Sequence, residues 1–440
     1  MTIPGMHALH DPPPTWPSGR FVRQRFESAD RDPSQLAADL ADQLRRSARL
    51  DALAPGARVG VAVGSRGITN LTLVVRTVID SLHERGLKPT VLPAMGSHGG
   101  ATAEGQRALL AGYGITEERV GASVDATMDT ESIGRDSGGH DVHLATAALH
   151  QVDAVIPINR VKPHTDFRAA VESGLAKMLV IGLGKQPGAE ATHALGMPAF
   201  ATRIPERAAM ILDRVHVPFG IALVENARKE TSTLSVVPGD RLLEEEAKLL
   251  EQATAEMARL PFDAADVVIL EQMGKDISGP GCDPNVLGRY LTTGMSGGPE
   301  IKRIACLDLT DGTHGNAVGI GQLDVITERL FQRIDFHATY TNLITSGGLE
   351  YAMVPMVAGT DQDLLLIAIA GAYCSLKTAR IAIARDTSHL ERLWLSNTLF
   401  DEADSGMLEV EQEAPLEFGT DGQLLTRIGN GWDTDRQGRG

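Results

Sequence analysis

Three short apolar segments in the first half of the chain each end in a loop of glycine and polar residues. They run from Arg58 to Val63, from Pro89 to Ala94 and from Asp153 to Ile158. Each is rich in aliphatic residues and has the length of a buried strand. Helical patterns follow the first two loops, and Asn70 and Gly86 are suited to cap the first helix at its two ends. This alternation predicts a mainly parallel sheet with flanking helices.

The loops after these strands carry one polar residue of interest each. Arg66 follows the first strand, His98 follows the second and His164 follows the third. In open parallel sheets, ligands bind in the crevice beyond the carboxyl ends of the strands. We therefore expect Arg66, His98 and His164 to converge at one edge of the sheet.

The second half of the chain repeats the α/β pattern. Apolar segments predict strands at Asp266 to Glu271, Ile304 to Leu309, Leu364 to Ile369 and Ile381 to Ala384. A chain of 440 residues is too long for one ordinary core. We predict an α/β protein of two domains, residues 1–262 and 263–440, each a mainly parallel sheet with flanking helices. The active site is expected in the cleft between them, with the first domain binding a cofactor and the second closing over it.

Charge and cysteine content exclude several classes of protein. A net charge of −16 disfavours nucleic-acid binding, which needs a basic face. The cysteines are three and widely separated, at positions 282, 306 and 374, which suits a reducing compartment. The first residues lack the pattern of a secretory signal, and no apolar run reaches the length of about 18 residues that a membrane span needs. We expect a cytoplasmic protein that binds neither nucleic acid nor membrane.

The stretch from Lys162 to His193 is the densest in functional side chains. Lys177 lies between Ser173-Gly174-Leu175-Ala176 and an apolar run. An apolar setting favours a lysine as nucleophile, whereas a lysine at a helix edge extends to water, and the sequence leaves both interpretations open. Most of the 13 histidines are expected to be structural or solvated.

The order of these residues resembles the nickel-dependent lactate racemase family and its related 2-hydroxyacid racemases and epimerases. The similarity spans most of the chain and is strongest between Arg58 and Gly196. It rests on Arg66, Gly96-Ser97-His98, Lys162-Pro163-His164, Ser173-Gly174 just before Lys177, and His193.

The resemblance implies a nickel-pincer nucleotide, pyridinium-3-thioamide-5-thiocarboxylic acid mononucleotide, attached covalently to Lys177 through a thioamide. Nickel would be held by two sulfurs and one carbon of the cofactor, with His193 as the protein ligand, and imidazole suits this metal. Ser173 and Gly174 would border the cofactor. The enzymes that synthesise the cofactor would be transient partners.

The implied activity is an isomerase that inverts C2 of a small 2-hydroxy acid. His98 and His164 would be the catalytic pair, and Arg66 would bind the substrate carboxylate through its planar guanidinium. Hydride removal gives a planar 2-keto acid, and only a cofactor can accept the hydride. Each enantiomer presents its hydroxyl proton on a different side, so two bases are needed.

The chain also departs from the family pattern. Gly174-Leu175-Ala176 stands where lactate racemases have a Gly-Gly-Arg run, and the segment from His164 to Ser173 is longer. We expect Arg168, inside that segment, to supply the basic group toward the cofactor. In the second domain, Lys275 and Arg289 are expected to bind the substrate carboxylate or the nucleotide phosphate, with ordinary solvated charges as the alternative.

Two other functions remain open from the residues alone. One is a hydrolase or lyase with a simple metal such as zinc, held by His98, His164 and His193 with a fourth position for water. The other is a non-catalytic protein of the same fold that binds an anion or a nucleotide.

Overall fold

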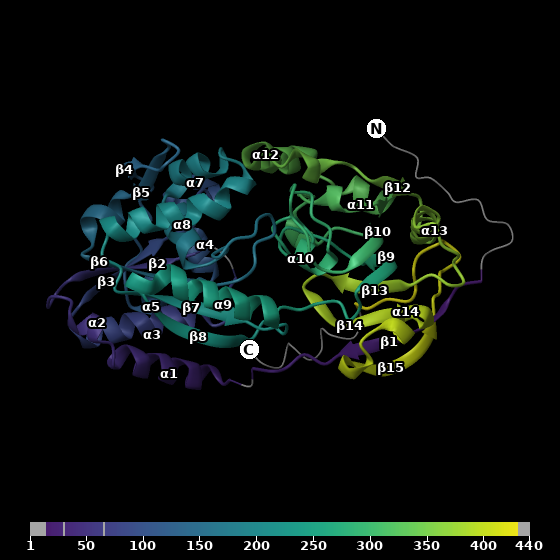
Figure 1. Cartoon of the computed structure of the whole chain (residues 1–440), viewed down its shortest axis with the longest axis horizontal. Helices are drawn as coiled ribbons and strands as arrows, with labels where there is room; N and C mark the ends of the chain where they lie inside the picture. The colour runs from purple at the N-terminus through teal and green to yellow at the C-terminus, as the bar shows by residue number, and fades with distance from the viewer. Residues whose placement is uncertain (1–14, 30, 65–66, 430–440) are drawn as a thin grey trace. The chain divides into compact units, whose positions relative to one another are not determined.

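The computed structural model describes residues 15–29, 31–64 and 67–429. The chain divides into two compact units (Figure 1). The N-terminal unit runs from Glu27 to Met257, and the C-terminal unit combines Ala258 onward with the segment that ends at Phe26. The division therefore falls five residues before the predicted boundary at 262.

A five-stranded sheet forms the centre of the N-terminal unit. Its spatial order is β3 (Lys88–Pro93), β2 (Arg58–Val63), β6 (Ala154–Arg160), β7 (Phe219–Glu225) and β8 (Thr231–Pro238). All neighbouring pairs are parallel except β7 with β8. The three strands predicted before the polar loops are β2, β3 and β6, so the predicted parallel sheet is confirmed.

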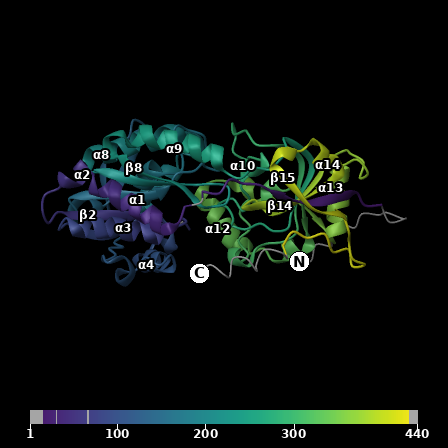
Figure 2. The same cartoon turned by 90° about the horizontal axis from the view of Figure 1, so that it is seen from below.

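Both faces of this sheet are covered because its strands are apolar on both sides. Val59, Val61 and Val63 of β2 pack with residues of α1 and α3, whereas Ala62 packs on the opposite face with α8 and α9. Figure 2 shows α8 and α9 on one side of the sheet and α3 on the other. The carboxyl edge of the sheet is thus left to the loops that carry the candidate residues.

The α-helices of this unit lie between and after the strands. They are α1 (Pro33–Arg45), α2 (Ala48–Asp51), α3 (Leu71–Glu84), α4 (Ala103–Gly112), α5 (Glu117–Val120), α6 (Leu175–Lys177), α7 (Lys185–His193), α8 (Met197–Arg214) and α9 (Leu242–Glu256). A two-stranded sheet of β4 (Thr130–Arg135) and β5 (Asp141–Ala145) completes the unit. Asn70 is the N-cap of α3, as predicted, and its backbone carbonyl accepts from Val74 at 2.9 Å. Its side chain makes no cap hydrogen bond and donates instead to Thr231 Oγ1 at 3.1 Å.

The C-terminal unit contains an eight-stranded sheet. Its order is β12 (Met356–Ala358), β11 (Val325–Thr327), β10 (Glu300–Cys306), β9 (Ala264–Leu270), β13 (Ile381–Asp386), β14 (His389–Ser396), β1 (Ser18–Gln24) and β15 (Leu408–Pro415). The first five strands are parallel and the last three are antiparallel. Strand β1 therefore belongs to this sheet, although the sequence placed it in the first domain. The strands that pair with β1 lie far along the chain, so the pairing leaves no pattern in the sequence around β1.

One predicted strand of this unit is a helix. Leu364 to Ile369 lies in α13 (Asp361–Gly371), whose N-cap Thr360 accepts a hydrogen bond from the backbone of Asp363. The helix is buried along most of its length, so its apolar run has no helical periodicity, and a short apolar run fits a buried strand equally well. The other α-helices here are α10 (Pro284–Leu287), α11 (Glu328–Gln332), α12 (Phe336–Ser346) and α14 (Asn397–Glu402). Among the described residues, no helix is long and apolar enough to cross a membrane.

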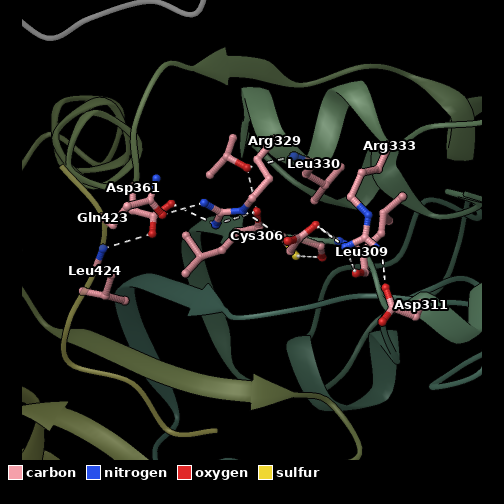
Figure 3. A network of polar contacts seen from close by, with 12 residues as sticks. Cys306, Leu309, Asp311, Arg329, Leu330, Arg333, Asp361, Gln423 and Leu424 are labelled. Atoms are coloured by element: carbon pink, nitrogen blue, oxygen red, sulfur yellow. Dashed lines mark hydrogen bonds and ion pairs between the residues drawn. The ribbon is translucent and has the colours of Figure 1, made fainter. Parts of the chain in front are cut away.

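Ion pairs fix the loops beyond β10 in the C-terminal unit (Figure 3). Arg329 of α11 binds Asp308 at 3.1 Å and Asp361 of α13 at 3.1 Å. Arg333, one helical turn later, binds Asp308 at 2.8 Å and Asp311 at 2.6 Å. The side chain of Asp361 is 1% exposed, so loss of Arg329 would leave a buried carboxylate with fewer partners.

Candidate functional site

The loop after β2 contains the predicted carboxylate anchor. Arg66 and its neighbour Ser65 lie outside the described residues. Gly64 before them is buried at the end of the strand. The role of Arg66 in substrate binding therefore stays a prediction.

The loop after β3 carries His98 and is tied to the segment that follows Lys177. Gly96 has a φ of +57°, and its backbone N–H donates to the carbonyl of Gly182 at 3.1 Å. A side chain here would bring Cβ within 3.2 Å of the Ile181 carbonyl, so both the positive φ and the close approach favour glycine. His98, two residues later, is exposed.

The loop after β6 is closed on itself and holds His164. Lys162 and Ser173 pair as an antiparallel bridge at its base. Glu172, 4% exposed, accepts the backbone N–H of His164 at 2.6 Å and that of Ala169 at 3.1 Å. Burial raises the pKa of Glu172, although these two hydrogen bonds lower it. Glu172 therefore fixes the backbone of the proposed base from inside the loop.

Arg168 also braces this loop. Its Nη1 donates to the carbonyl of His164 at 2.6 Å and to that of Phe167 at 3.2 Å. It also lies 3.5 Å from a carboxylate oxygen of Glu172. The guanidinium thus has a structural role at the predicted site, and its contact with the nucleotide remains a prediction.

Lys177 lies at the end of α6, in a turn shaped by a buried carboxylate. Glu246 of α9 is 0% exposed and accepts the backbone N–H of Ala176 at 2.8 Å. A Cβ at Gly174 would lie 2.1 Å from Oε1 of Glu246, which explains the glycine. Asn159, in β6, donates to the Gly174 carbonyl at 2.8 Å. The turn is therefore anchored both to the central sheet and to α9.

The side chains of Lys177 and His164 meet directly. Nζ of Lys177 lies 2.5 Å from Nε2 of His164. The other ring nitrogen, Nδ1, faces the backbone N–H of Asp166 at 3.0 Å. Phe167 packs on the imidazole, with ring centroids 4.5 Å apart. This pair joins the proposed attachment point of the cofactor to one of the proposed bases.

Burial and nearby cations keep His164 neutral. Desolvation lowers its pKa well below the ordinary value, and the charge of Lys177 lowers it further. A neutral imidazole near pH 7 is the form that accepts a proton. The ring is therefore unprotonated near neutral pH, and its role as a base stays a prediction.

The charge of Lys177 gives a first testable prediction. Replacing Lys177 by methionine should raise the pKa of His164, because a neighbouring cation is removed. The pKa should stay below the ordinary value of 6.5, because desolvation is the largest cause of the shift and is retained. NMR titration of the ring signals, assigned with His164→Gln, measures this. Lys248→Met, on the exposed face of α9, is the control, and an unchanged pKa in Lys177→Met would contradict the prediction.

His193 ends α7, and its orientation suits a metal ligand. Nδ1 lies 2.7 Å from the carbonyl oxygen of Ala189, to which it donates, so the lone pair of a neutral ring lies on Nε2. Desolvation lowers the pKa of His193, and the charge of Lys177 adds to this effect. Phe200 packs edge-on against the ring, 5.2 Å between centroids. A neutral imidazole with its second nitrogen fixed by a carbonyl is a suitable metal ligand, and the role of His193 in binding nickel stays a prediction.

Phe167 and Phe200 connect the two histidine environments. Their ring centroids are 5.4 Å apart, and both side chains are buried. Phe167 contacts His164 and Phe200 contacts His193. The structure thus brings His164, Lys177 and His193 to one apolar wall of the N-terminal unit.

A simple metal site does not form among these residues. Within the described part of the chain, no three His, Cys, Asp or Glu side chains are grouped so that they could hold a metal ion. His98, His164 and His193 are all described. The three-histidine zinc site therefore has no support in the structure, whereas a single protein ligand from His193 is compatible with it.

Lys275 and Arg289 lie in the C-terminal unit. The ammonium of Lys275 donates to the side-chain carbonyl of Asn342 in α12. Arg289 binds Asp324 at 3.1 Å and the carbonyl of Ile301 at 3.1 Å. These contacts hold the two side chains in place locally, and their roles in substrate binding stay predictions.

Glu172 and Glu246 are site residues that the sequence did not reveal. Glu246 had a usable signal, because Leu242, Glu246 and Leu250 recur at a spacing of four and share the buried face of α9. A charged residue in an apolar stripe indicates a buried partner. Glu172 had no such signal, because its loop has no regular period.

Glu246 gives a second prediction. Burial raises its pKa to about 7 in the folded state, from an ordinary value of 4.5. Between these values the folded state binds more protons than the unfolded state, so stability should fall as pH rises from about 4.5 to about 7. In Glu246→Gln this part of the fall should disappear. Urea midpoints across this pH range test it, with Glu251→Gln, an exposed position of α9, as control. An identical pH profile in Glu246→Gln and the parent would refute it.

Comparison with known proteins gives matches among solved structures only. No family model matches the chain, and no curated protein sequence matches it. Among solved structures, the chain is similar to the lactate racemase apoprotein from Thermoanaerobacterium thermosaccharolyticum, at 14% sequence identity and a TM-score of 0.49. The match covers 80% of this chain and 92% of that chain.

Proposed function

We propose that the chain is an isomerase that inverts C2 of a small 2-hydroxy acid with a nickel-pincer nucleotide attached to Lys177. The observation that carries the proposal is the 2.5 Å contact between Lys177 and His164, on one apolar wall with His193. A lysine and a histidine with its lone pair on Nε2 are the groups that such a cofactor would take from its protein, and a neutral base beside them would serve the proton transfers. The ordered resemblance to the nickel-dependent lactate racemase family supports the same assignment.

The residues present fit the cofactor. Lys177 would hold it through its amine, and His193 would hold nickel through Nε2. Ser173, Gly174 and Arg168 would border the nucleotide. When bound, the group would take hydride from C2 of the substrate and return it.

The protein's own part in the reaction is binding and proton transfer. Arg66 would bind the carboxylate of the substrate, and Lys275 and Arg289 would add contacts to the carboxylate or the phosphate. His164 would take the hydroxyl proton of one enantiomer at its imidazole nitrogen, and His98 would take that of the other. Phe167 and Phe200 would exclude water from the side of His164 and His193.

Chiral analysis of products tests this function. The chain would be produced together with the enzymes of cofactor synthesis and incubated with single enantiomers of a short aliphatic, a dicarboxylic and a sugar-derived 2-hydroxy acid. Interconversion of the enantiomers or epimers of at least one acid is expected. A preparation with a stoichiometric adduct and nickel that inverts none of them would overturn the proposal. Chiral analysis is preferred to solvent exchange, because hydride transfer can proceed without exchange.

The binding-only alternative predicts a different result. A non-catalytic protein of this fold would bind a nucleotide or an anion without a covalent adduct at Lys177. The contact between Lys177 and His164 favours the enzyme, because anion binding alone requires no base beside the lysine.

A further inference from the structure

Lys185 is an unusual buried lysine at the start of the helix that ends in His193. It is 1% exposed, and its φ of +53° lies in the left-handed region, which long side chains rarely adopt. Lysine is almost never fully buried without partners. A strained backbone and a buried cation at one position indicate that the side chain is held there for a purpose.

The ammonium of Lys185 binds groups that belong to the His98 segment. Nζ donates to the carbonyl of Pro93, the last residue of β3, at 2.7 Å, and to Oε1 of Gln106 at 3.0 Å. Gln106, on α4, is 0% exposed. Its amide donates to the carbonyl of Gly96 at 2.8 Å and to that of His98 at 3.3 Å. An unbroken chain of hydrogen bonds therefore runs from the first residue of α7 to the backbone of His98.

The other end of α7 is anchored independently. Thr192, next to His193, accepts a hydrogen bond from Arg207 of α8 at 2.7 Å. Arg207 in turn binds Asp136 at 2.8 Å, and these two side chains are 1% and 0% exposed. The last turn of α7 is therefore held on α8. The hydrogen bonds of Lys185 hold the first turn of α7 against the His98 loop.

We propose that Lys185 and Gln106 are positioning residues that lock the His98 loop to the helix carrying His193. The inference rests on the proposed function for the roles of the two histidines, whereas the lock itself is a property of the chain alone. A base must lie within hydrogen-bond reach of the substrate, and a small misplacement costs much of the rate. The buried network would hold one proposed base and the proposed nickel ligand as a single body.

A substitution at Lys185 can remove the charge of the side chain while nearly keeping its shape. Methionine has a similar length and removes the buried cation together with its donors, so Lys185→Met tests the hydrogen bonds with little change in packing. Burial lowers the pKa of Lys185 to about 8, and the nearby charge of Asp125 raises it. Desolvation thus makes the cation costly to the fold, so its removal need not destabilise the unit as a whole.

Hydrogen exchange on the chain without cofactor tests the lock directly. In Lys185→Met, the peptide over residues 94–102 and the start of α7 should exchange about 10- to 100-fold faster, because charge-assisted hydrogen bonds are lost. Amides of β7 should be unchanged. Equal acceleration throughout the N-terminal unit, or none at all, would overturn the proposal. Lys229→Met is the matched control, since Lys229 has a φ of +59° but is exposed in the turn between β7 and β8.

Gln106→Glu removes the hydrogen bonds between Gln106 and the His98 loop. Its carboxylate keeps the acceptor for Lys185 but loses the donors to the Gly96 and His98 carbonyls. Residues 94–102 should therefore exchange faster while the start of α7 stays protected. Protection of residues 94–102 in this variant would show that Gln106 is not the link.

Kinetics of the loaded chain separate this inference from the proposed function. Lys185→Met should lower kcat on the order of 10- to 100-fold with a smaller change in KM. Full kcat in a variant whose loop exchanges faster would overturn the positioning role. If the parent chain is inactive but the exchange pattern is as expected, the hydrogen-bonded link between the His98 loop and α7 is supported and the proposed function is wrong.

Discussion

Replacing His164 by glutamine should lower turnover of the loaded chain by a factor on the order of 10² to 10⁴ in both directions. Each inversion uses one base to accept the hydroxyl proton and the other to return it. Turnover should therefore fall with either enantiomer as substrate. His98→Gln should show a loss of the same order for the same reason. Chiral product analysis from each pure enantiomer measures both directions.

The controls for this experiment follow from the structure. His164 contacts Lys177, so the variant must first be shown by intact mass to carry the adduct. His150→Gln is a matched control, because His150 is 54% exposed and pairs with Glu131. A loaded His164→Gln protein with full turnover would remove His164 from the proton transfers.

Replacing Lys177 by methionine should abolish the covalent adduct and with it all turnover. The thioamide requires the lysine nitrogen, and methionine supplies no nucleophile of that kind. Intact mass and metal analysis should show the unmodified chain and little nickel, because His193 would be the protein's single nickel ligand. Lys248→Met should load as the parent does.

His193→Ala separates attachment from metal binding. The adduct at Lys177 should form with its nickel held less firmly, because the cofactor supplies three donors and the protein ligand is gone, and turnover should fall to background. A stoichiometric adduct on Lys177→Met, or one that maps to another residue in the parent, would contradict the assignment of Lys177. Turnover at the parent's rate in a loaded His193→Ala protein would contradict the assignment of His193.

The parallel sheet of the N-terminal unit was predictable because its signals are local. The apolar segments Arg58 to Val63 and Asp153 to Ile158 lie in strands: β2 ends at Val63, as predicted, and β6 continues two residues past Ile158. Parallel strands place their carboxyl ends at one edge, so the order of the loops predicts which residues lie near that edge. The α13 helix was mispredicted because a fully buried apolar segment has no periodicity to read.

No pattern in the sequence predicted that β1 belongs to the sheet of the C-terminal unit. It pairs with β14 and β15, which lie more than 360 residues further along the chain. Nothing in the composition of residues 18–24 distinguishes an N-terminal strand of the first unit from one that crosses to the second. The pairing of strands far apart in the sequence depends on how complete helices and strands pack together.

The sequence by itself determined most strands of the N-terminal sheet and the identity of the candidate residues, because strand length, loop glycines and residue order are properties of neighbouring positions. The tertiary structure alone decided that Lys177 meets His164, that Glu246 shapes the lysine turn, and that Lys185 reaches the His98 loop through Gln106. Each of these is a contact of buried or part-buried polar groups. Such groups must find partners wherever the packed chain places them, so the partners are set by the packing and cannot be read from the neighbouring sequence.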